Sequence, residues 1–468
     1  MEEVAFWNPV AQDSRTNGVG DRKHGIERTA FVADVNVPAR YPFEVTIHQG
    51  RIERILQENL GLYAPANTIR RSHHFIEYQV DTEKHPEYPI LVKYQYEHED
   101  GTVAQGSVRT RYLIGADGAH SKVRKRMGLE LQGETSDHIW GVCDFVVDTD
   151  FPDIRKRCAV HSSAGSVMVI PRERIATGEF LTRLYVQVPG GQGMIVSMMD
   201  SYNLAWKLAH NIHGLTPSIP KGMADPVLET FELERTDIAR QLIDFDTKFS
   251  HMFSGKIGTK SSSTQELTHE EYLRVFSEGS GFSSGCGLQY HPSRIVSMSG
   301  KPASSQVSVG EPLSGCLCPG RRIMNVELKR YADGTTRQLH DEIVSSGRYG
   351  LMVLASNDML DPRGTSQEAL QSCEKIIRKF PAGTIDLIVL QPLEKRFEWT
   401  DVPRCVKQFA EMRTYGLAKG EDAYRTYGVA KDDGAIVGVR PDGYVGMLSR
   451  LTAPDMAEAY FKGCLLEV

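Results

Sequence analysis

Residues 115–124, Gly-Ala-Asp-Gly-Ala-His-Ser-Lys-Val-Arg, place a carboxylate between glycines at the end of an apolar stretch. A carboxylate at the end of a β-strand can accept hydrogen bonds from ribose hydroxyls, and glycine lets a ligand approach the backbone closely. Asp117 and Gly118 are therefore a candidate nucleotide-binding pair. Ser121 can cap the basic helix expected after them. The alternative is a plain strand–turn–helix connection in which Asp117 forms an Asx-turn.

A second candidate is the glycine cluster Pro-Gly-Gly-Gln-Gly-Met, residues 189–194, between an expected strand at 183–188 and an expected long helix. Glycine lets the backbone reverse in little space. The N-terminus of a helix carries partial positive charge. Gly191, Gln192, Gly193 and Met194 form this junction. The alternative is a glycine turn before an ordinary core helix that starts near Met194 and shares one core with the strand.

Several elements are expected to position these residues. Residues 42–50 are typical of a strand, and 51–61 of a helix that ends at Gly61. Residues 88–118 indicate a hairpin with an Asp-Gly turn, followed by a strand that reaches Gly115. Residues 225–255 show apolar side chains at helical spacing. The helix that begins near Met194 has its own apolar spacing, Ile195, Met199, Tyr202, Trp206 and Ala209.

The C-terminal part reads as a separate unit. Residues 278–320 are rich in Ser, Gly and Pro, which is typical of a linker, and from residue 321 strand and helix patterns alternate. The expected regions are a partial cofactor- and substrate-binding part at 1–190, a helical part at 191–300, a linker at 301–320 and an α/β domain at 321–468.

Composition excludes several classes of protein. A chain of 468 residues predicts more than one domain. The net charge of −6 argues against a nucleic-acid or membrane-surface binder, and no apolar run is long enough to span a membrane. The eight cysteines form no C-x-x-C pair, and the acidic start has no apolar signal core. We expect free thiols, no metal site and a cytoplasmic location.

These motifs, in this order, resemble the flavin-dependent aromatic hydroxylases of the phenol hydroxylase branch. The similar stretches are GADGAHSKVR (115–124), HQGRIERIL (48–56), VIPRE (169–173), RLYVQV (183–188), PGGQGM (189–194) and YGVAKDDGAIVGVRPDGYVG (427–446). The resemblance implies an α/β (α+β) chain. Its first part would be a partial FAD-dependent hydroxylase fold with a mixed sheet and substrate-domain strands. Its C-terminal domain would be thioredoxin-like.

The resemblance also implies a function. It implies a monooxygenase that uses FAD, NADPH and oxygen to hydroxylate a phenolic or aromatic polyketide substrate in secondary metabolism, commonly as a homodimer. Gln49 and Arg51, at a loop–helix junction, match residues that contact FAD. Gly191, Gln192, Gly193 and Met194 match the segment whose backbone lies against the flavin ring, at the N-terminus of a helix. Arg172 and Tyr185 match an arginine and a tyrosine near the flavin and the substrate. A tyrosine hydroxyl there can support deprotonation of the phenol.

Three departures from the family accompany this resemblance. The chain contains no G-x-G-x-x-G motif, and RLYVQV meets PGGQGM directly although a long segment separates them in the family. The asparagine that follows GQGM in the family is Ile195 here. These departures predict a shallow cleft and weak FAD binding. They keep two alternatives open: a flavin-free accessory or binding protein, and an inactive truncated homologue.

Overall fold

The computed structural model describes residues 1–10, 25–37, 39–65, 68–98, 100–132, 141–162, 165–186, 193–217, 223–254, 279–298, 315–343, 345–393 and 397–468. The chain divides into two compact units. The first unit joins residues 1–45 to residues 140–468, and the second comprises residues 46–139. Each unit is described by itself.

The first unit begins with a mixed six-stranded sheet of order β2-β1-β7-β8-β9-β6. The strands are β1 (Glu3–Pro9), β2 (Ile26–Ala33), β6 (Gly141–Val146), β7 (Arg157–Ser162), β8 (Gly165–Arg174) and β9 (Phe180–Val186). The pairing of β1 with β7 is parallel and the other pairings are antiparallel. Alternate side chains of β1, β7 and β8 form a small core, with Val4, Phe6, Ala159 and Met168 buried. The expected mixed sheet is therefore present.

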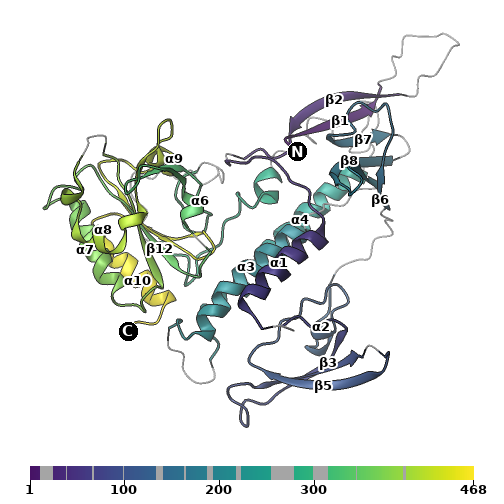
Figure 1. Cartoon of the computed structure of the whole chain (residues 1–468), viewed down its shortest axis with the longest axis horizontal. Helices are drawn as coiled ribbons and strands as arrows, with labels where there is room; N and C mark the ends of the chain where they lie inside the picture. The colour runs from purple at the N-terminus through teal and green to yellow at the C-terminus, as the bar shows by residue number, and fades with distance from the viewer. Residues whose placement is uncertain are drawn as a thin grey trace. The chain divides into compact units, whose positions relative to one another are not determined.

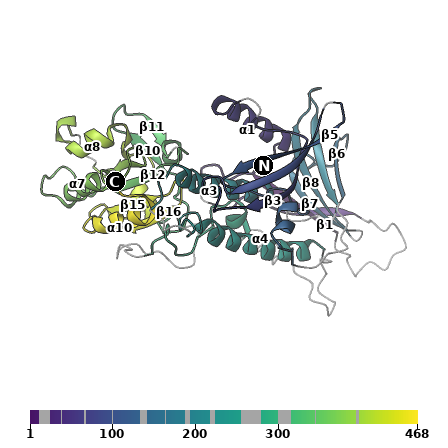
Figure 2. The ribbon, with the colours of Figure 1, turned by 90° about the horizontal axis from the view of Figure 1, so that it is seen from below.

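Two helices of the first unit lie side by side, α3 (Gly193–Ile212) and α4 (Thr230–Ser254) (Figure 1, Figure 2). Both were expected, and α3 begins within one residue of the predicted start. The expectation that β9 and α3 share one core is wrong. Tyr185 of β9 packs with the β1–β8 core, whereas Met199 and Trp206 of α3 pack in two other clusters. Helix α4 and the C-terminal domain supply the apolar partners of α3, so β9 is not needed to cover this helix.

The C-terminal domain is built on a seven-stranded sheet of order β11-β10-β14-β13-β12-β15-β16. The strands are β10 (Glu327–Arg330), β11 (Thr336–Gln338), β12 (Tyr349–Leu354), β13 (Ile385–Leu390), β14 (Thr414–Leu417), β15 (Ala435–Val439) and β16 (Val445–Ser449). Strands β12, β13 and β14 run parallel, while β15 and β16 form an antiparallel hairpin beside β12. This order is compatible with the thioredoxin-like unit expected, which stays a prediction.

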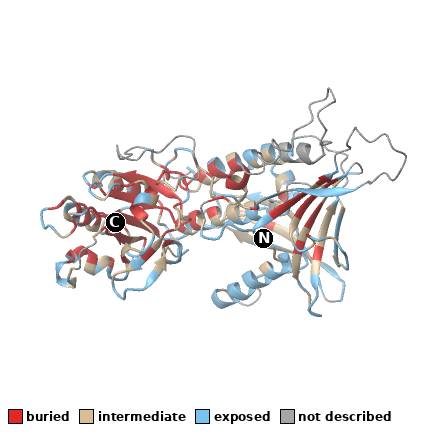
Figure 3. Ribbon diagram, turned by 90° about the horizontal axis from the view of Figure 1, so that it is seen from above, coloured by how far each residue is buried: buried red, intermediate tan, exposed pale blue. Residues whose placement is uncertain are grey.

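Helices cover both faces of the C-terminal sheet. Helices α7 (Thr365–Ile377), α8 (Arg404–Phe409) and α10 (Pro454–Cys464) pack on one face. Helices α6 (Leu339–Glu342) and α9 (Ala423–Tyr427) pack on the other. Strands β12, β13, β15 and β16 are almost wholly buried (Figure 3). This sandwich is the largest hydrophobic interior among the described residues.

The C-terminal domain begins earlier in the sequence than residue 321. The backbone N–H of Ser297 donates to Gly446 O at 2.7 Å, and Gln289 forms a β-bridge with Arg321. Ile295 is fully buried in the domain core. Part of the stretch expected to be a linker therefore belongs to the folded domain. The expected boundaries near 190 and 300 fall beside residues outside the described ranges and stay predictions.

The second unit contains α1 (Gln49–Tyr63), an antiparallel sheet of β3 (His73–Val80), β4 (Ile90–Glu97) and β5 (Val103–Thr110), and the short helix α2 (Lys122–Arg126). The predicted hairpin is confirmed as β4–β5. Its turn contains Gly101 at φ +80°, a conformation that glycine adopts without steric cost.

Three predictions for this region are wrong. Residues 42–48 form no strand, and β5 ends at Thr110, so residues 111–118 are not in a strand either. A strand needs a ladder of backbone hydrogen bonds to a neighbour. Glu44 exchanges a single pair with Met1, which is too short for a ladder, and none of the backbone hydrogen bonds among the described residues involves Leu113–Ala116. Helix α1 continues through Gly61 to Tyr63 and ends at Ala64. The residue before a proline disfavours helical angles, so Pro65 rather than Gly61 sets this end.

Candidate functional site

The Asp117 carboxylate caps helix α2. It accepts hydrogen bonds from the Ser121 hydroxyl and from the backbone N–H groups of Lys122 (2.7 Å) and Val123 (3.3 Å). The hydrogen bond from Ser121 and the backbone N–H groups lower the pKa of Asp117, so the group is ionised at neutral pH. Three of the roughly four acceptor positions of the carboxylate are thus used locally. These contacts come from residues four to six positions further on, so they cap α2 and are not the Asx-turn of the alternative, which would use the N–H of Ala119. A ribose contact stays a prediction.

The glycines beside Asp117 have separate structural reasons. A Cβ atom on Gly115 would lie 2.9 Å from the Val123 Cβ, so glycine is required for α2 to pack against this segment. Gly118 has φ +77°, a conformation that other residues adopt only with strain. Both glycines therefore shape the turn whether or not a nucleotide binds there.

The first turn of α1 offers donors for an anionic group. Gln49 is the first helical residue, while His48 is the N-cap and accepts a hydrogen bond from the Gly50 N–H at 3.1 Å. The side chains of Gln49 and Arg51 are exposed and hydrogen-bond to no other described residue. The turn contains no acidic residue. An amide, a guanidinium and a helix N-terminus fit the phosphate-bearing part of a cofactor such as FAD.

Tyr185 lies in an ion-paired network on the six-stranded sheet. The Arg183 guanidinium donates to both oxygens of Asp144 at 2.7 and 2.6 Å, and to the Tyr185 hydroxyl oxygen at 3.1 Å. The hydrogen bond to Asp144 is the main cause that raises the pKa of Arg183, so this side chain keeps its charge. Because Arg183 supplies a donor to the Tyr185 oxygen, the Tyr185 proton is available for another acceptor.

The structure does not bring Arg172 next to Tyr185. Tyr185 lies opposite Met168 in the β8–β9 pairing, and Arg172 is four residues further along β8, roughly 13 Å away at the usual strand rise. Arg172 is instead paired with Glu173 at 3.2 Å. The residues that lengthen this part of the sequence form the ends of β8 and β9 and the turn between them, in which Gly178 has φ +93°.

The glycine cluster is only partly described. Gly191 and Gln192 lie outside the described residues. Gly193 and Met194 form the start of α3, and Ile195 is 45% exposed. Their contact with a cofactor stays a prediction.

Sequence reasoning missed a buried charged cluster, which we call the α3–α4 quartet: Lys207, Glu234, Arg440 and Asp442. The Glu234 carboxylate accepts from Lys207 Nζ at 2.8 Å and from Arg440 at 2.5 and 3.0 Å. Arg440 also donates to Asp442 at 3.0 and 2.6 Å. All four side chains are at most 2% exposed. The quartet links α3 and α4 to the β15–β16 turn of the C-terminal domain.

The charges within the quartet balance, since it has two cations and two carboxylates. Burial opposes ionisation of Glu234, but Arg440 and Lys207 outweigh it and bring its pKa to about 2. Asn203 and Trp206 donate further hydrogen bonds to the Glu234 and Asp442 carboxylates. The only sequence signal was a pair of polar residues one turn apart, Asn203 and Lys207, within the apolar spacing of α3.

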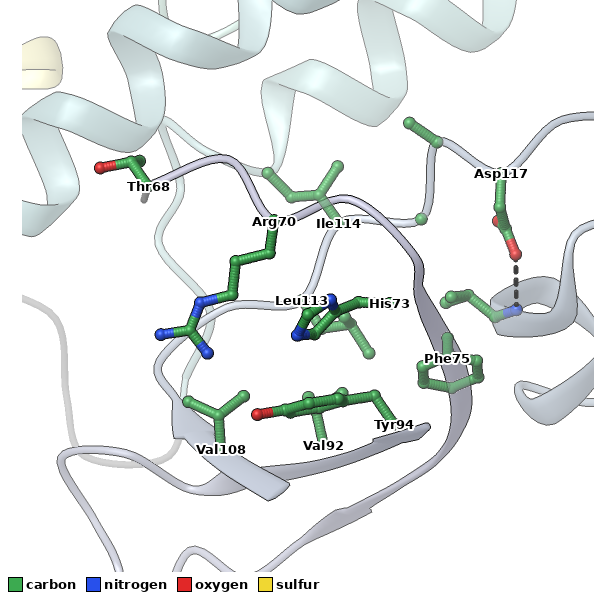
Figure 4. A pocket seen from close by; sticks show the side chains of 13 residues that line it. Thr68, Arg70, His73, Phe75, Val92, Tyr94, Val108, Leu113, Ile114 and Asp117 are labelled. Atoms are coloured by element: carbon green, nitrogen blue, oxygen red, sulfur yellow. Dashed lines mark hydrogen bonds between the residues drawn. The ribbon is translucent and has the colours of Figure 1, made fainter. Parts of the chain in front are cut away.

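The second unit contains an open pocket of about 550 Å³. Apolar side chains of the three-stranded sheet form one wall, and residues 113–117 form the opposite side. Arg70, His73 and Tyr94 lie along the same pocket (Figure 4). The His73 and Tyr94 ring centroids are 5.2 Å apart. Asp117 lies at one edge and is joined to the start of α2 (Figure 4).

Two expectations concern membrane-spanning helices and the cysteines. No described helix is long and apolar enough to cross a membrane. The eight cysteines all fall within the described ranges and none forms a disulfide.

Family models match most of the chain. The model "FAD binding domain" matches residues 7–189 and, separately, 185–246. The two matches overlap at residues 185–189, where RLYVQV is followed directly by the glycine cluster. At this place the family has a long segment that this sequence lacks. The model "Phenol hydroxylase, C-terminal dimerisation domain" matches residues 288–468.

Relatives match over nearly the whole chain. The flavin-dependent oxygenase ucdD of Aspergillus ustus is 33% identical over 92% of this chain and 78% of its own length. The phenol 2-monooxygenase fsqG of Aspergillus fumigatus is 27% identical over 99% of this chain and 84% of its own length.

The fold is also shared with solved structures. The flavin-dependent monooxygenase PieE, in complex with FAD and substrate, aligns with a TM-score of 0.61 at 17% identity over 99% of this chain and 87% of that one. The anhydrotetracycline hydroxylase OxyS of Streptomyces rimosus aligns with a TM-score of 0.54 at 18% identity over 88% of this chain and 78% of that one. By its family matches and relatives, the chain belongs to the FAD-dependent monooxygenases of the phenol hydroxylase branch.

Proposed function

We propose that this monooxygenase uses FAD, NADPH and oxygen to hydroxylate a phenolic or aromatic polyketide substrate in secondary metabolism. The observation that carries the proposal is the joint match of the FAD binding domain and the phenol hydroxylase dimerisation domain. The names of the relatives support the substrate class. They include the phenol 2-monooxygenase fsqG and the 3-hydroxybenzoate 4-monooxygenase of Comamonas testosteroni, the latter 26% identical over 99% of this chain and 84% of its own length.

The residues proposed to hold FAD are Gln49, Arg51, Asp117, Gly118 and the glycine cluster. Gln49 and Arg51 offer an exposed amide and an exposed cation for phosphate oxygens. Asp117 retains about one free acceptor position for a ribose hydroxyl, since three are used by α2. FAD, when bound, supplies the redox chemistry and the activation of oxygen, and the chain supplies binding and orientation.

Tyr185 is proposed to bind the phenolic oxygen of the substrate. Its hydroxyl oxygen accepts from Arg183, so its own O–H is free to donate to that phenolic oxygen. The permanent charge of Arg183 adjoins the same point and favours the phenolate over the phenol. A phenolate ring is more nucleophilic than a phenol ring. Tyr185 and Arg183 would thus activate the substrate, while Asp144 fixes the orientation of Arg183.

We propose that Arg172 contributes to a different part of the site from Tyr185, because the two residues lie at different positions along the sheet. Its side chain is only 10% exposed and is partly neutralised by Glu173. A homodimer is proposed from the dimerisation domain at residues 288–468.

The test supplies the full chain with FAD, NADPH and simple phenols, and measures NADPH oxidation, hydrogen peroxide and hydroxylated product. We expect FAD-dependent NADPH oxidation that releases much of its oxygen as peroxide, because the FAD-binding segments named above are absent from the sequence. Tyr185→Phe should lower product per NADPH by roughly tenfold or more, in line with the worth of a positioned proton donor. Tyr63→Phe is the control, because Tyr63 is 87% exposed on α1. Absence of FAD-dependent NADPH oxidation would contradict the proposal.

A further inference from the structure

Helix α4 contacts two separate interiors of the first unit. Near its start, Glu234 accepts hydrogen bonds from Arg440 of the C-terminal domain at 2.5 and 3.0 Å. Phe245, which lies roughly 16 Å further along the helix at the usual rise, packs in the core of the six-stranded sheet. The same core includes Tyr185. One helix therefore joins the C-terminal domain to the sheet that carries the proposed substrate-binding tyrosine.

Phe245 packs on the face of the sheet from which Tyr185 projects. Tyr185 is directly opposite Met168 in the β8–β9 pairing, so these two side chains lie on one face. Both Phe245 and Tyr185 pack against the buried residues of that face, which include Met168. The Arg183 guanidinium donates to the Tyr185 hydroxyl oxygen at 3.1 Å. Tyr185 is therefore held by Arg183 at its hydroxyl and by an apolar core that Phe245 helps to fill.

The Phe245 ring is itself held by the segment that leads into the C-terminal domain. Its centroid is 5.8 Å from the centroid of the Phe282 ring. Phe282 packs against a buried cluster that includes Tyr290 and Tyr444 of the C-terminal domain. A Cβ atom on Gly279 would lie 2.5 Å from a carbon of the Phe245 ring, so glycine is required at position 279 for the ring to occupy this place.

We propose that Phe245 is a positioning residue, through which the C-terminal domain sets the place of Tyr185 at the substrate. This inference rests on the proposed function, in which the Tyr185 hydroxyl binds the phenolic oxygen. Protein interiors are close-packed, so a ring that fills the core transmits its displacement to its neighbours. A displacement of about 1 Å can cost a positioned group ~100-fold in rate. The C-terminal domain thus acts on substrate activation, a role separate from the dimerisation that its family description names.

The test uses the full-length chain with FAD and without NADPH, so that the probe binds but is not hydroxylated. The probe is 4-nitrophenol, whose phenolate absorbs visible light much more strongly than its phenol. A tyrosine hydroxyl beside the permanent charge of Arg183 favours the phenolate, so the bound probe should ionise at a lower pH than the free probe. The readout is the ratio of phenolate to phenol in the bound probe at one fixed pH.

Phe245→Ala should lower this ratio roughly tenfold, within the range that a displacement of about 1 Å allows. Phe245→Leu keeps most of the apolar volume and should restore most of the wild-type ratio. Gly279→Ala should also lower the ratio, because its Cβ would displace the Phe245 ring. Val169→Ala is the matched control and should leave the ratio unchanged, because Val169 is buried on the opposite face of β8 with Ala5 and Cys158.

The variants are compared at unchanged circular dichroism. A wild-type ratio in Phe245→Ala, or an equal loss in Val169→Ala, would overturn the positioning role and leave the proposed function intact. If Phe245→Ala does not fold, Gly279→Ala decides, and a wild-type ratio in that variant would overturn the inference. A wild-type chain that does not bind the probe, or binds it without favouring the phenolate, would contradict the proposed role of Tyr185 and this inference with it.

Discussion

Replacing Arg440 by Met should strongly destabilise the contact between the helices α3 and α4 and the C-terminal domain. The Arg440 side chain is fully buried and donates hydrogen bonds to the carboxylates of Glu234 and Asp442. Methionine fills part of the volume but leaves those two carboxylates facing one remaining cation, Lys207. Removing one partner of a buried ion pair costs about 3–5 kcal/mol. The free energy of unfolding should fall by that amount.

The charge balance of the quartet gives a sharper prediction. Arg440→Met leaves one excess negative charge, and Glu234→Gln alone leaves one excess positive charge. The double variant restores neutrality with Lys207 and Asp442. It should therefore be less destabilised than the sum of the single variants, by about 1.5 kcal/mol or more.

The assay is urea unfolding of the full chain followed by tryptophan fluorescence, since the Trp206 indole donates to Asp442 at 3.1 Å and reports on the cluster. Arg378→Met is the control, because the side chain of Arg378 is 52% exposed in its pair with Glu374 and such pairs contribute ~0.5 kcal/mol. Equal effects of Arg440→Met and Arg378→Met, or strict additivity in the double variant, would refute the reasoning.

Three further predictions follow from other sites. The pKa of Glu234 is about 2 against an ordinary value of 4.5, so its stabilising contribution is fully present above pH 4.5 and is lost as the pH falls toward 2. The difference in urea midpoint between wild type and Glu234→Gln should therefore shrink from pH 4.5 to pH 2, and a constant difference would argue against this linkage. Gly115→Ala should destabilise the second unit by about 1–3 kcal/mol, because the added Cβ would clash with Val123. Gly61 has open space around it, so Gly61→Ala should stabilise α1 by ~0.5–1 kcal/mol. A Gly115→Ala variant that is more stable to heat than Gly61→Ala would be inconsistent with this packing. Asp117→Ala should remove a capping interaction from α2 and weaken FAD binding, which flavin fluorescence titration measures. Unchanged FAD affinity would reject its cofactor role.

Local patterns predicted the elements whose stability is local. The β4–β5 hairpin followed from an Asp-Gly turn between apolar runs, and the long helices α3 and α4 followed from helical spacing. The strand expected to reach Gly115 failed for the opposite reason. Its apolar residues have strand character, but a strand exists only with a neighbour, and the described residues give Leu113–Ala116 none.

The site residues also divide into those close together in the sequence, which could be predicted, and those that only the fold brings together. The Asp117–Gly118 turn and its capped helix could be predicted from ten consecutive residues. The Arg183–Asp144 pair and the quartet could not, since they join residues from different elements. Glu234 and Arg440 are 206 residues apart in the sequence, and only the packing of the C-terminal domain on α4 brings them together. Charged residues at those positions predict exposed side chains, because burial of a charge requires a partner that the sequence does not reveal.

The most direct test of the central claim is the origin of the oxygen atom in the product. The chain is incubated with FAD, NADPH, a phenol and ¹⁸O₂, and the product is analysed by mass spectrometry. An FAD-dependent monooxygenase predicts one ¹⁸O atom per hydroxylated product, with no product when FAD is omitted and less product with Tyr185→Phe. Product that carries oxygen from water, or that forms equally well without FAD, would contradict the account.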